Sequence, residues 1–284
     1  MLLRILLCFF CCSFGAAGTP ILGGADAEHR KFNHQASLQE ITTNNEHFCG
    51  GSIISSIWIL TAAHCVDCER IRNDIKRIRI VVGVTHLSEN GDKYLVRSSK
   101  LHEKWNKENI SNDIALLKTA KNIKFSSAVQ PVILATHDPP DGVITTLTGW
   151  GFTSDDEGLV SNTLQVAYFE KISLKECRKQ FNDAQYPGRL VIETNICITQ
   201  PVAKGQCNGD SGGPLMYNGT QIGIVSFGGQ CGEGVPGVMT NIAKFLKWIK
   251  DKTNISQLKQ LSKIYLRLSL NSSITLTKIP QTAI

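Results

Sequence analysis

The chain has 284 residues, of which 42% are hydrophobic and 19% are charged, and its formal net charge is +6. This composition excludes a disordered or fibrous protein, and it supplies a core for one large domain of two halves or for two domains. Because the positive excess lies in Arg4 and in four basic residues after residue 253, residues 19–253 carry only +1, which argues against a nucleic-acid partner.

The first eighteen residues, MLLRILLCFFCCSFGAAG, predict a secretory signal peptide. Arg4 precedes a short apolar run, and the small residues Ala16 and Gly18 stand before the expected cleavage point. A membrane anchor is the alternative, but the run is shorter than the roughly 20 residues that a spanning helix needs. We therefore expect a secreted, extracellular protein without a membrane span.

Ten cysteines are present, and three of them lie in the leader. The body keeps an odd number, so secretion predicts disulfides with one thiol left over. The C-x-x-C formed by Cys65 and Cys68 is also compatible with zinc or a redox pair. No second ligand pair follows at zinc spacing, so we expect no metal there. The remaining cysteines are Cys49, Cys65, Cys68, Cys177, Cys197, Cys207 and Cys231.

Short runs rich in β-branched residues alternate with glycine-rich turns along the body, a pattern typical of an all-β barrel or sandwich. Proline-rich residues 120–142 would link two β halves. Residues 241–252 place apolar side chains at helical intervals and predict an amphipathic helix that docks on the body. The runs are SIISSIWIL (52–60), RIRIVVGV (77–84), DIALLK (113–118), VITTLTGW (143–150), TLQVAYF (163–169), QIGIVSFGG (221–229) and GVMTNI (237–242).

Five separate motifs occur in a fixed order: I-L-G-G at 21–24, T-A-A-H-C at 61–65, N-D-I-A-L-L at 112–117, G-W-G at 149–151 and G-D-S-G-G-P at 209–214. Together they resemble the chymotrypsin-like (trypsin-fold) serine proteases over residues 21–253. The resemblance implies an all-β fold of two antiparallel six-stranded β-barrels with a C-terminal helix. The barrels would span about 21–125 and 140–240, the helix about 241–252, and a basic extension 254–284.

The resemblance implies a serine endopeptidase, a hydrolase that needs no cofactor. Ser211 would be the nucleophile and His64 the general base and then acid, because imidazole accepts a proton near neutral pH. Asp113 would fix the tautomer of His64 and stabilise its charged form. The N–H groups of Gly209 and Ser211 would form the oxyanion hole, where glycines let the backbone approach the substrate.

Cysteine pairing follows from the same resemblance. Cys49 would pair with Cys65, Cys177 with Cys197, and Cys207 with Cys231. Cys68 would be left over, either free, as we favour, or bridged to another molecule. The calcium loop of the family would begin near residue 84, but Val84 stands where an acidic ligand is expected. We therefore predict no bound calcium and no other metal.

By resemblance the specificity pocket has its floor at Gly205 and its walls at Gly228 and Gly237. No carboxylate stands at the floor, so we expect a chymotrypsin-like preference for large apolar or aromatic residues before the scissile bond. Gly205 and Met239 depart from the usual chymotrypsin residues, which leaves the depth of the pocket open. Trypsin-like cleavage, with Glu233 reaching a basic side chain, and elastase-like cleavage are the alternatives. Ile110 would line the neighbouring subsite.

Activation in this family frees the amino group of the isoleucine, here Ile21, which then pairs with the acid beside the nucleophile, here Asp210. The usual cut follows Arg or Lys, but residue 20 is Pro. We interpret Thr19-Pro20 as a propeptide of a zymogen, removed by an X-Pro dipeptidyl peptidase after signal cleavage behind Gly18.

Four N-x-S/T sequons predict a glycoprotein, at Asn109, Asn218, Asn254 and Asn271. Expected partners are protein or peptide substrates and protein protease inhibitors, and we expect a monomer. The extension after residue 253 could touch an anionic surface, although a disordered or trimmed tail fits its composition better. The alternative to an enzyme is a protease-fold homologue that binds a partner without cutting it.

Overall fold

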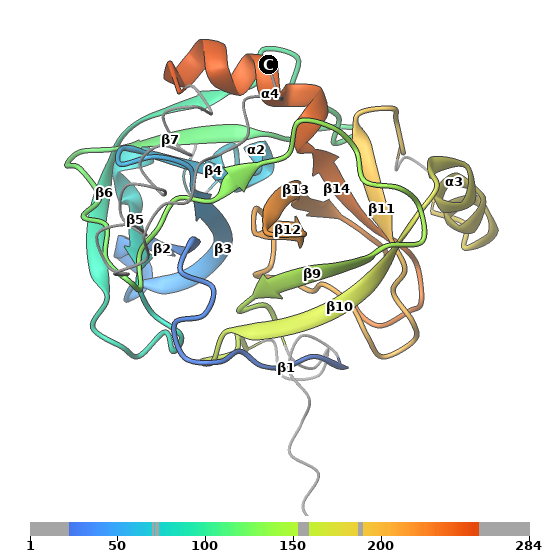
Figure 1. Cartoon of the computed structure of the whole chain (residues 1–284), viewed down its shortest axis with the longest axis horizontal. Helices are drawn as coiled ribbons and strands as arrows, with labels where there is room; N and C mark the ends of the chain where they lie inside the picture. Colours follow the sequence, from blue (N-terminus) through green and yellow to red (C-terminus); the bar gives the residue numbers. More distant parts are fainter. Residues whose placement is uncertain (1–22, 70, 72–73, 153–158, 187–189, 256–284) are drawn as a thin grey trace, which may run out of the picture.

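The computed structural model describes residues 23–69, 71, 74–152, 159–186 and 190–255, which form two β-barrels side by side (Figure 1). The first barrel closes in the order β2-β3-β4-β7-β6-β5 with every pairing antiparallel. Its strands are β2 (Gln35–Glu40), β3 (Glu46–Ile53), β4 (Trp58–Thr61), β5 (Ile78–Val82), β6 (Asp92–Leu101) and β7 (Ala115–Thr119). The run 52–60 thus contributes to two strands, β3 and β4, joined by a turn.

The second barrel also has six antiparallel strands, and it closes where β9 pairs with both β12 and β10. Two short strands join it from earlier in the chain: β1 (Ala25–Asp26) pairs with β10, and β8 (Ile133–Leu134) runs parallel to β13. The chain therefore crosses to the second barrel before it builds the first. The barrel strands are β9 (Ile144–Gly149), β10 (Gln165–Ile172), β11 (Asn195–Ile198), β12 (Pro214–Tyr217), β13 (Thr220–Phe227) and β14 (Gly237–Asn241).

Helix α4 (Ile242–Thr253) agrees with the helix predicted from apolar spacing. The Asn241 side chain caps it, and buried Ile242, Phe245 and Ile249 belong to the core cluster of the first barrel. The other helical segments of the described residues are η1 (Ile41–Thr43), α2 (Ala63–Val66), η2 (Ile75–Arg77) and α3 (Leu174–Asp183), none of which was predicted. Across the described ranges, no helix has the length and apolar character needed to cross a membrane.

Each barrel encloses its own apolar core. Along β6 the alternation of exposed and buried residues puts Tyr94 and Val96 inside, as expected for strands with one face in a core. A second cluster, with Leu147, Ile198 and Met239, fills the other barrel. The predicted all-β fold of two six-stranded barrels with a C-terminal helix is confirmed.

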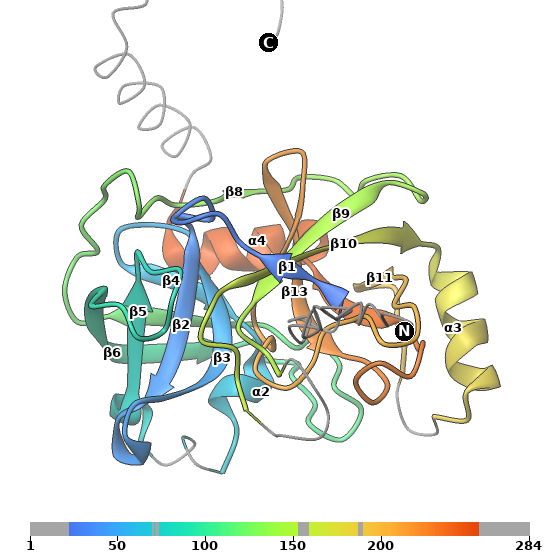
Figure 2. The same cartoon turned by 90° about the horizontal axis from the view of Figure 1, so that it is seen from below.

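The two barrels meet through buried polar contacts. Ser52 Oγ of β3 donates to Gln221 Oε1 of β13 at 2.6 Å, and Thr148 Oγ1 donates to Gln35 Oε1 at 2.8 Å. The Gly50 N–H donates to the Ser211 carbonyl at 2.7 Å. Figure 2, which views the fold from below, shows β2 and β3 on one side of this boundary and β9, β10 and β13 on the other.

Replacing Gln221 with alanine tests the contribution of this boundary. Gln221 and Ser52 are fully buried, so the variant leaves the Ser52 hydroxyl without its acceptor. We expect the free energy of unfolding to fall by about 2–3 kcal/mol in a denaturant titration of a Ser211→Ala background, which prevents self-digestion. The control is Gln230→Ala at an exposed residue. Equal effects of the two substitutions would contradict the prediction.

Candidate active site

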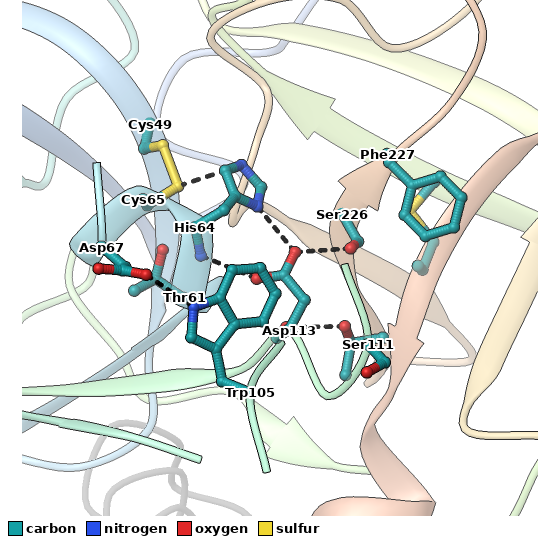
Figure 3. A network of polar contacts seen from close by, with 12 residues as sticks. Cys49, Thr61, His64, Cys65, Asp67, Trp105, Ser111, Asp113, Ser226 and Phe227 are labelled. Atoms are coloured by element: carbon teal, nitrogen blue, oxygen red, sulfur yellow. Dashed lines mark hydrogen bonds and ion pairs between the residues drawn. A yellow bond between two sulfur atoms is a disulfide. The ribbon is translucent and has the colours of Figure 1, made fainter. Parts of the chain in front are cut away.

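His64 lies on the short helix α2, directly after β4, at the boundary of the barrels. The disulfide between Cys49 on β3 and Cys65 fixes this helix to the barrel wall (Figure 3). The His64 side chain is 29% exposed, which leaves one edge of the ring open to a substrate. On the protein side, His64 Nδ1 lies 2.7 Å from Asp113 Oδ2 and the His64 backbone N–H donates to Asp113 Oδ1 at 2.9 Å.

Asp113 is a buried carboxylate with several hydrogen-bond donors. Besides His64, Ser226 Oγ of β13 donates to Asp113 Oδ2 at 2.6 Å, and Thr240 Oγ1 of β14 donates to the Asp113 carbonyl at 2.7 Å. Burial alone would raise the pKa of Asp113, but the charge of His64 and the hydrogen bonds from His64 and Ser226 outweigh it and hold the pKa below its ordinary value. Asp113 is therefore ionised at neutral pH.

His64 and Ser211 line one cleft of about 430 Å³. Its other lining residues include Trp105, whose Nε1 donates to Asp67 Oδ2 at 3.0 Å, and Ile110, which was predicted to form the neighbouring subsite. The structure thus brings together the three residues predicted for catalysis: Asp113 holds His64, and His64 and Ser211 face a common space.

Two backbone N–H groups at and beside Ser211 are candidates for an oxyanion hole. Within the described part of the chain, neither the Gly209 N–H nor the Ser211 N–H forms a hydrogen bond. The peptide between Gly209 and Asp210 is fixed at both ends, because His47 Nε2 donates to the Gly209 carbonyl at 2.9 Å and the Asp210 N–H donates to the Cys207 carbonyl at 3.0 Å. Gly209 has φ +100°, a conformation that favours glycine.

Asp210 is fully buried and lies among backbone groups. Its Oδ1 accepts from the Gly151 N–H at 2.8 Å and its Oδ2 from the Cys207 N–H at 2.9 Å. Burial raises the pKa of Asp210 to about 6, although both hydrogen bonds act to lower it. A cation would stabilise this carboxylate. Ile21, the predicted partner, lies outside the described residues.

The three glycines of the predicted specificity pocket lie near one another, but only Gly228 lines the cleft. Gly205 and Gly237 are in contact with the side chain of Gln200 instead. Glu233 accepts a hydrogen bond from the Tyr186 hydroxyl, and no acidic side chain lines the cleft within the described residues. The structure therefore gives no support for Glu233 as the partner of a basic substrate residue.

Three disulfides join Cys49 to Cys65, Cys177 to Cys197, and Cys207 to Cys231, in the pairing that the resemblance implies. Cys68 is free and its thiol donates to the Cys65 carbonyl at 3.5 Å. Cys49 and Cys65 also cluster with His64, but their sulfur atoms are bonded to each other and do not form a metal site.

In the loop where the family binds calcium, Val84 is buried and Glu89 binds protein groups. Glu89 Oε1 accepts from the Thr85 N–H, the His86 N–H and His86 Nδ1 at 2.7–3.1 Å, and Arg30 lies within 3.7 Å of Oε2. Burial would raise the pKa of Glu89, but these hydrogen bonds lower it to about 2. Glu89 is thus neutralised by groups of the chain itself.

Three of the four sequon asparagines are described. Asn218 is exposed in the turn between β12 and β13, and Asn254 is exposed at the end of α4. Asn109 is half-buried, and its Oδ1 accepts from the Ser111 N–H at 3.1 Å. Asn271 lies outside the described residues.

A two-barrel fold in which a serine and a histidine line one cleft, with a buried aspartate holding the histidine, is that of a serine endopeptidase. The trypsin family description matches residues 21–249, so this chain belongs to the trypsin family. Brachyurin of Leptuca pugilator is 37% identical over 241 residues, which cover 83% of this chain and 100% of brachyurin. Chymotrypsin-2 of Vespa crabro is 35% identical, covering 81% of this chain and 98% of that protein. The structure of neuropsin, a mouse brain serine protease, has a TM-score of 0.71 and 30% identity, covering 81% and 98% of the two chains.

Sequence reasoning missed several residues around the site. Ser226 and Thr240, which hold Asp113, come from β13 and β14, and His47, which holds Gly209, comes from β3. The S-F-G-G motif at 226–229 marked this segment, but only for its glycines. Gln200 and Gln206 near the pocket glycines have no motif of their own.

Asp113→Asn tests the buried carboxylate. The amide cannot stabilise the charged ring of His64 and favours the wrong tautomer, so we expect kcat at neutral pH to fall by about 10⁴-fold, the magnitude known for such triads. Asp92→Asn removes an exposed carboxylate from β6 and serves as the matched control. Turnover of a peptide substrate by the Asp113→Asn variant within about ten-fold of the wild type would contradict this assignment.

Proposed function

We propose that this protein is a secreted endopeptidase that cleaves protein or peptide substrates after uncharged apolar residues, by way of an acyl-enzyme on Ser211. The observation that supports it most directly is the pair of His64 and buried Asp113 at the cleft that Ser211 also lines. The absence of an acidic lining side chain among the described residues favours a chymotrypsin-like over a trypsin-like preference.

The proposed reaction follows from the positions of these groups. Ser211 Oγ attacks the substrate carbonyl while His64 Nε2 accepts its proton, and His64 then gives that proton to the leaving amine. Asp113 stabilises the imidazolium that forms in between. The free N–H groups of Gly209 and Ser211 are suited to bind the negative oxygen of the tetrahedral intermediate. Water then hydrolyses the acyl-enzyme in the same two steps.

A protease-fold binding protein is the competing proposal, and a serine-reactive phosphonate distinguishes the two. Labelling of the native protein that disappears in Ser211→Ala supports the enzyme. No labelling of a protein whose chain begins at Ile21 would overturn the proposed function.

Maturation is proposed to expose Ile21 by removal of Thr19-Pro20. Asp210 supports this step because it is fully buried and has only neutral N–H donors within the described residues. The ammonium of Ile21 would supply the missing charge and order the loop at Gly209. The chain is thus proposed to be a zymogen. Its glycosylation, its inhibition by protein inhibitors and its monomeric state remain predictions from the sequence.

The activation pair predicts a loss of activity at alkaline pH. Pairing with Asp210 raises the pKa of the Ile21 amino group, so the active form is fully present below the ordinary α-amino pKa of about 8 and is lost as pH rises through the higher value of the folded enzyme. We expect kcat/KM to fall reversibly in one proton step above about pH 8, and N-terminal sequencing confirms the starting residue.

A protein that begins at Thr19 provides the control, because it lacks the ammonium at this position and should be inactive at every pH. Undiminished activity of the Ile21 form well above about pH 8, with circular dichroism unchanged, would contradict the pairing.

A further inference from the structure

The space between the two pocket walls is filled by a side chain of the protein itself. A Cβ atom added to Gly228 would lie 3.2 Å from Gln206 Nε2, and one added to Gly237 would lie 3.2 Å from Gln206 Oε1. The amide of Gln206 therefore lies across the slot between these glycines. Gln206 and Gly228 line the cleft, whereas Gly205 and Gly237 do not.

Gln200 fills the space beyond Gln206. A Cβ atom at Gly205 would lie 2.7 Å from the Gln200 amide, and one at Gly237 would lie 2.5 Å from it. With its oxygen accepting from the Gln206 N–H at 3.0 Å and its nitrogen donating to the Val235 carbonyl at 3.3 Å, the Gln200 amide is satisfied. Glycine at 205 and 237 thus makes room for Gln200 and leaves no open slot at that depth.

The Gln206 amide is held in place at one end only. Its Nε2 donates to the Phe227 carbonyl at 2.7 Å, while its buried Oε1 has no partner in the described part of the protein. Gln206 is 8% exposed, so this oxygen is shielded from bulk water. An unpaired buried acceptor is unfavourable, and a hydrogen-bond donor at the end of a substrate side chain would satisfy it.

We propose that Gln206, supported by Gln200, is the floor of a shortened specificity pocket and limits the residue before the scissile bond to uncharged side chains of leucine, methionine or glutamine length. A phenyl or indole ring inserted between Gly228 and Gly237 would overlap the Gln206 amide. A glutamine side chain of the substrate would instead bring an N–H donor to Gln206 Oε1. This inference rests on the proposed function. It removes the large aromatic residues from the preference expected from the sequence and adds glutamine to the apolar ones.

The test measures kcat/KM for one peptide series with Leu, Met, Gln, Phe, Trp or Lys before the cleaved bond. The wild type should favour Leu, Met and Gln over Phe and Trp. Gln206→Ala removes the floor and should raise the ratio of Phe to Leu cleavage at least about ten-fold, since contacts of this size in a pocket discriminate by that factor or more.

Gln206→Glu keeps the shape of the side chain, so it provides a second test of the pocket floor if the alanine variant folds poorly. Its carboxylate would face the substrate and should raise the ratio of Lys to Leu cleavage at least about ten-fold. Gln185→Glu, the same change at an exposed residue outside the cleft lining, should leave both ratios unchanged. Each ratio compares kcat/KM for two substrates with the same enzyme variant. A general loss of folded protein lowers both values equally and leaves the ratio unchanged.

The phosphonate label separates this inference from the proposed function. If the Ile21 form of each protein is labelled at Ser211 but both ratios remain at the wild-type value in both Gln206 variants, the shortened pocket is wrong and the protease assignment stands. A labelled wild type that cleaves after Phe or Trp better than after Leu also overturns it. If the wild type is not labelled, the proposed function and this inference both fail.

Discussion

The active site depends on one buried carboxylate shared between two barrels. Asp113 comes from the first barrel, next to β7. Ser226 of β13 donates to its carboxylate from the second barrel, and Thr240 of β14 donates to its backbone carbonyl. Burial raises the pKa of this carboxyl group, and Ser226 of the second barrel acts together with His64 of the first to lower it. Docking of the barrels therefore adds a donor to the carboxylate that holds His64, and the contacts of Ser52 with Gln221 and of Gly50 with Ser211 fix the same boundary.

A second buried carboxylate, Asp210, has a different set of hydrogen-bond donors from that of Asp113. Its donors are two neutral backbone N–H groups, and its pKa remains raised to about 6 by burial. Asp113 is thus stable as an anion within the described fold, whereas Asp210 is not fully compensated there. This difference is consistent with the two roles proposed above, a permanent anion at Asp113 and an acceptor of a new positive charge at Asp210. Both groups are aspartate carboxylates, and their different surroundings account for the opposite shifts of their pKa values.

Much of this could be predicted from the sequence because it depends on local patterns. The strand runs and the apolar spacing of α4 indicated an all-β body with a C-terminal helix, and the resemblance of the five motifs to a known family implied the two six-stranded barrels. Helix α3 was missed although Ser173 caps it, because its single stripe of buried residues, Cys177 and Phe181, is short. The donors to Asp113 were missed for a different reason. A serine or threonine in a strand has no sequence feature that tells whether its hydroxyl meets a carboxylate from another barrel or a neighbouring backbone group.

The specificity pocket shows most clearly where sequence reasoning stops. A glycine in the sequence shows that its position has no side chain. It does not show whether the side chain of another residue fills that space. At Gly205 and Gly237 the space is taken by Gln200, and between Gly228 and Gly237 by Gln206. Relatives named trypsin and chymotrypsin are 34% and 35% identical to this chain, so overall identity does not choose between them. Identity of that kind reflects the cores and motifs that both share, whereas the substrate residue is selected by a few side chains whose positions depend on the loops between them. In this chain the side chains that fill the space at these glycines are uncharged amides, and the proposed selection by length and hydrogen bonding of the substrate residue rests on them.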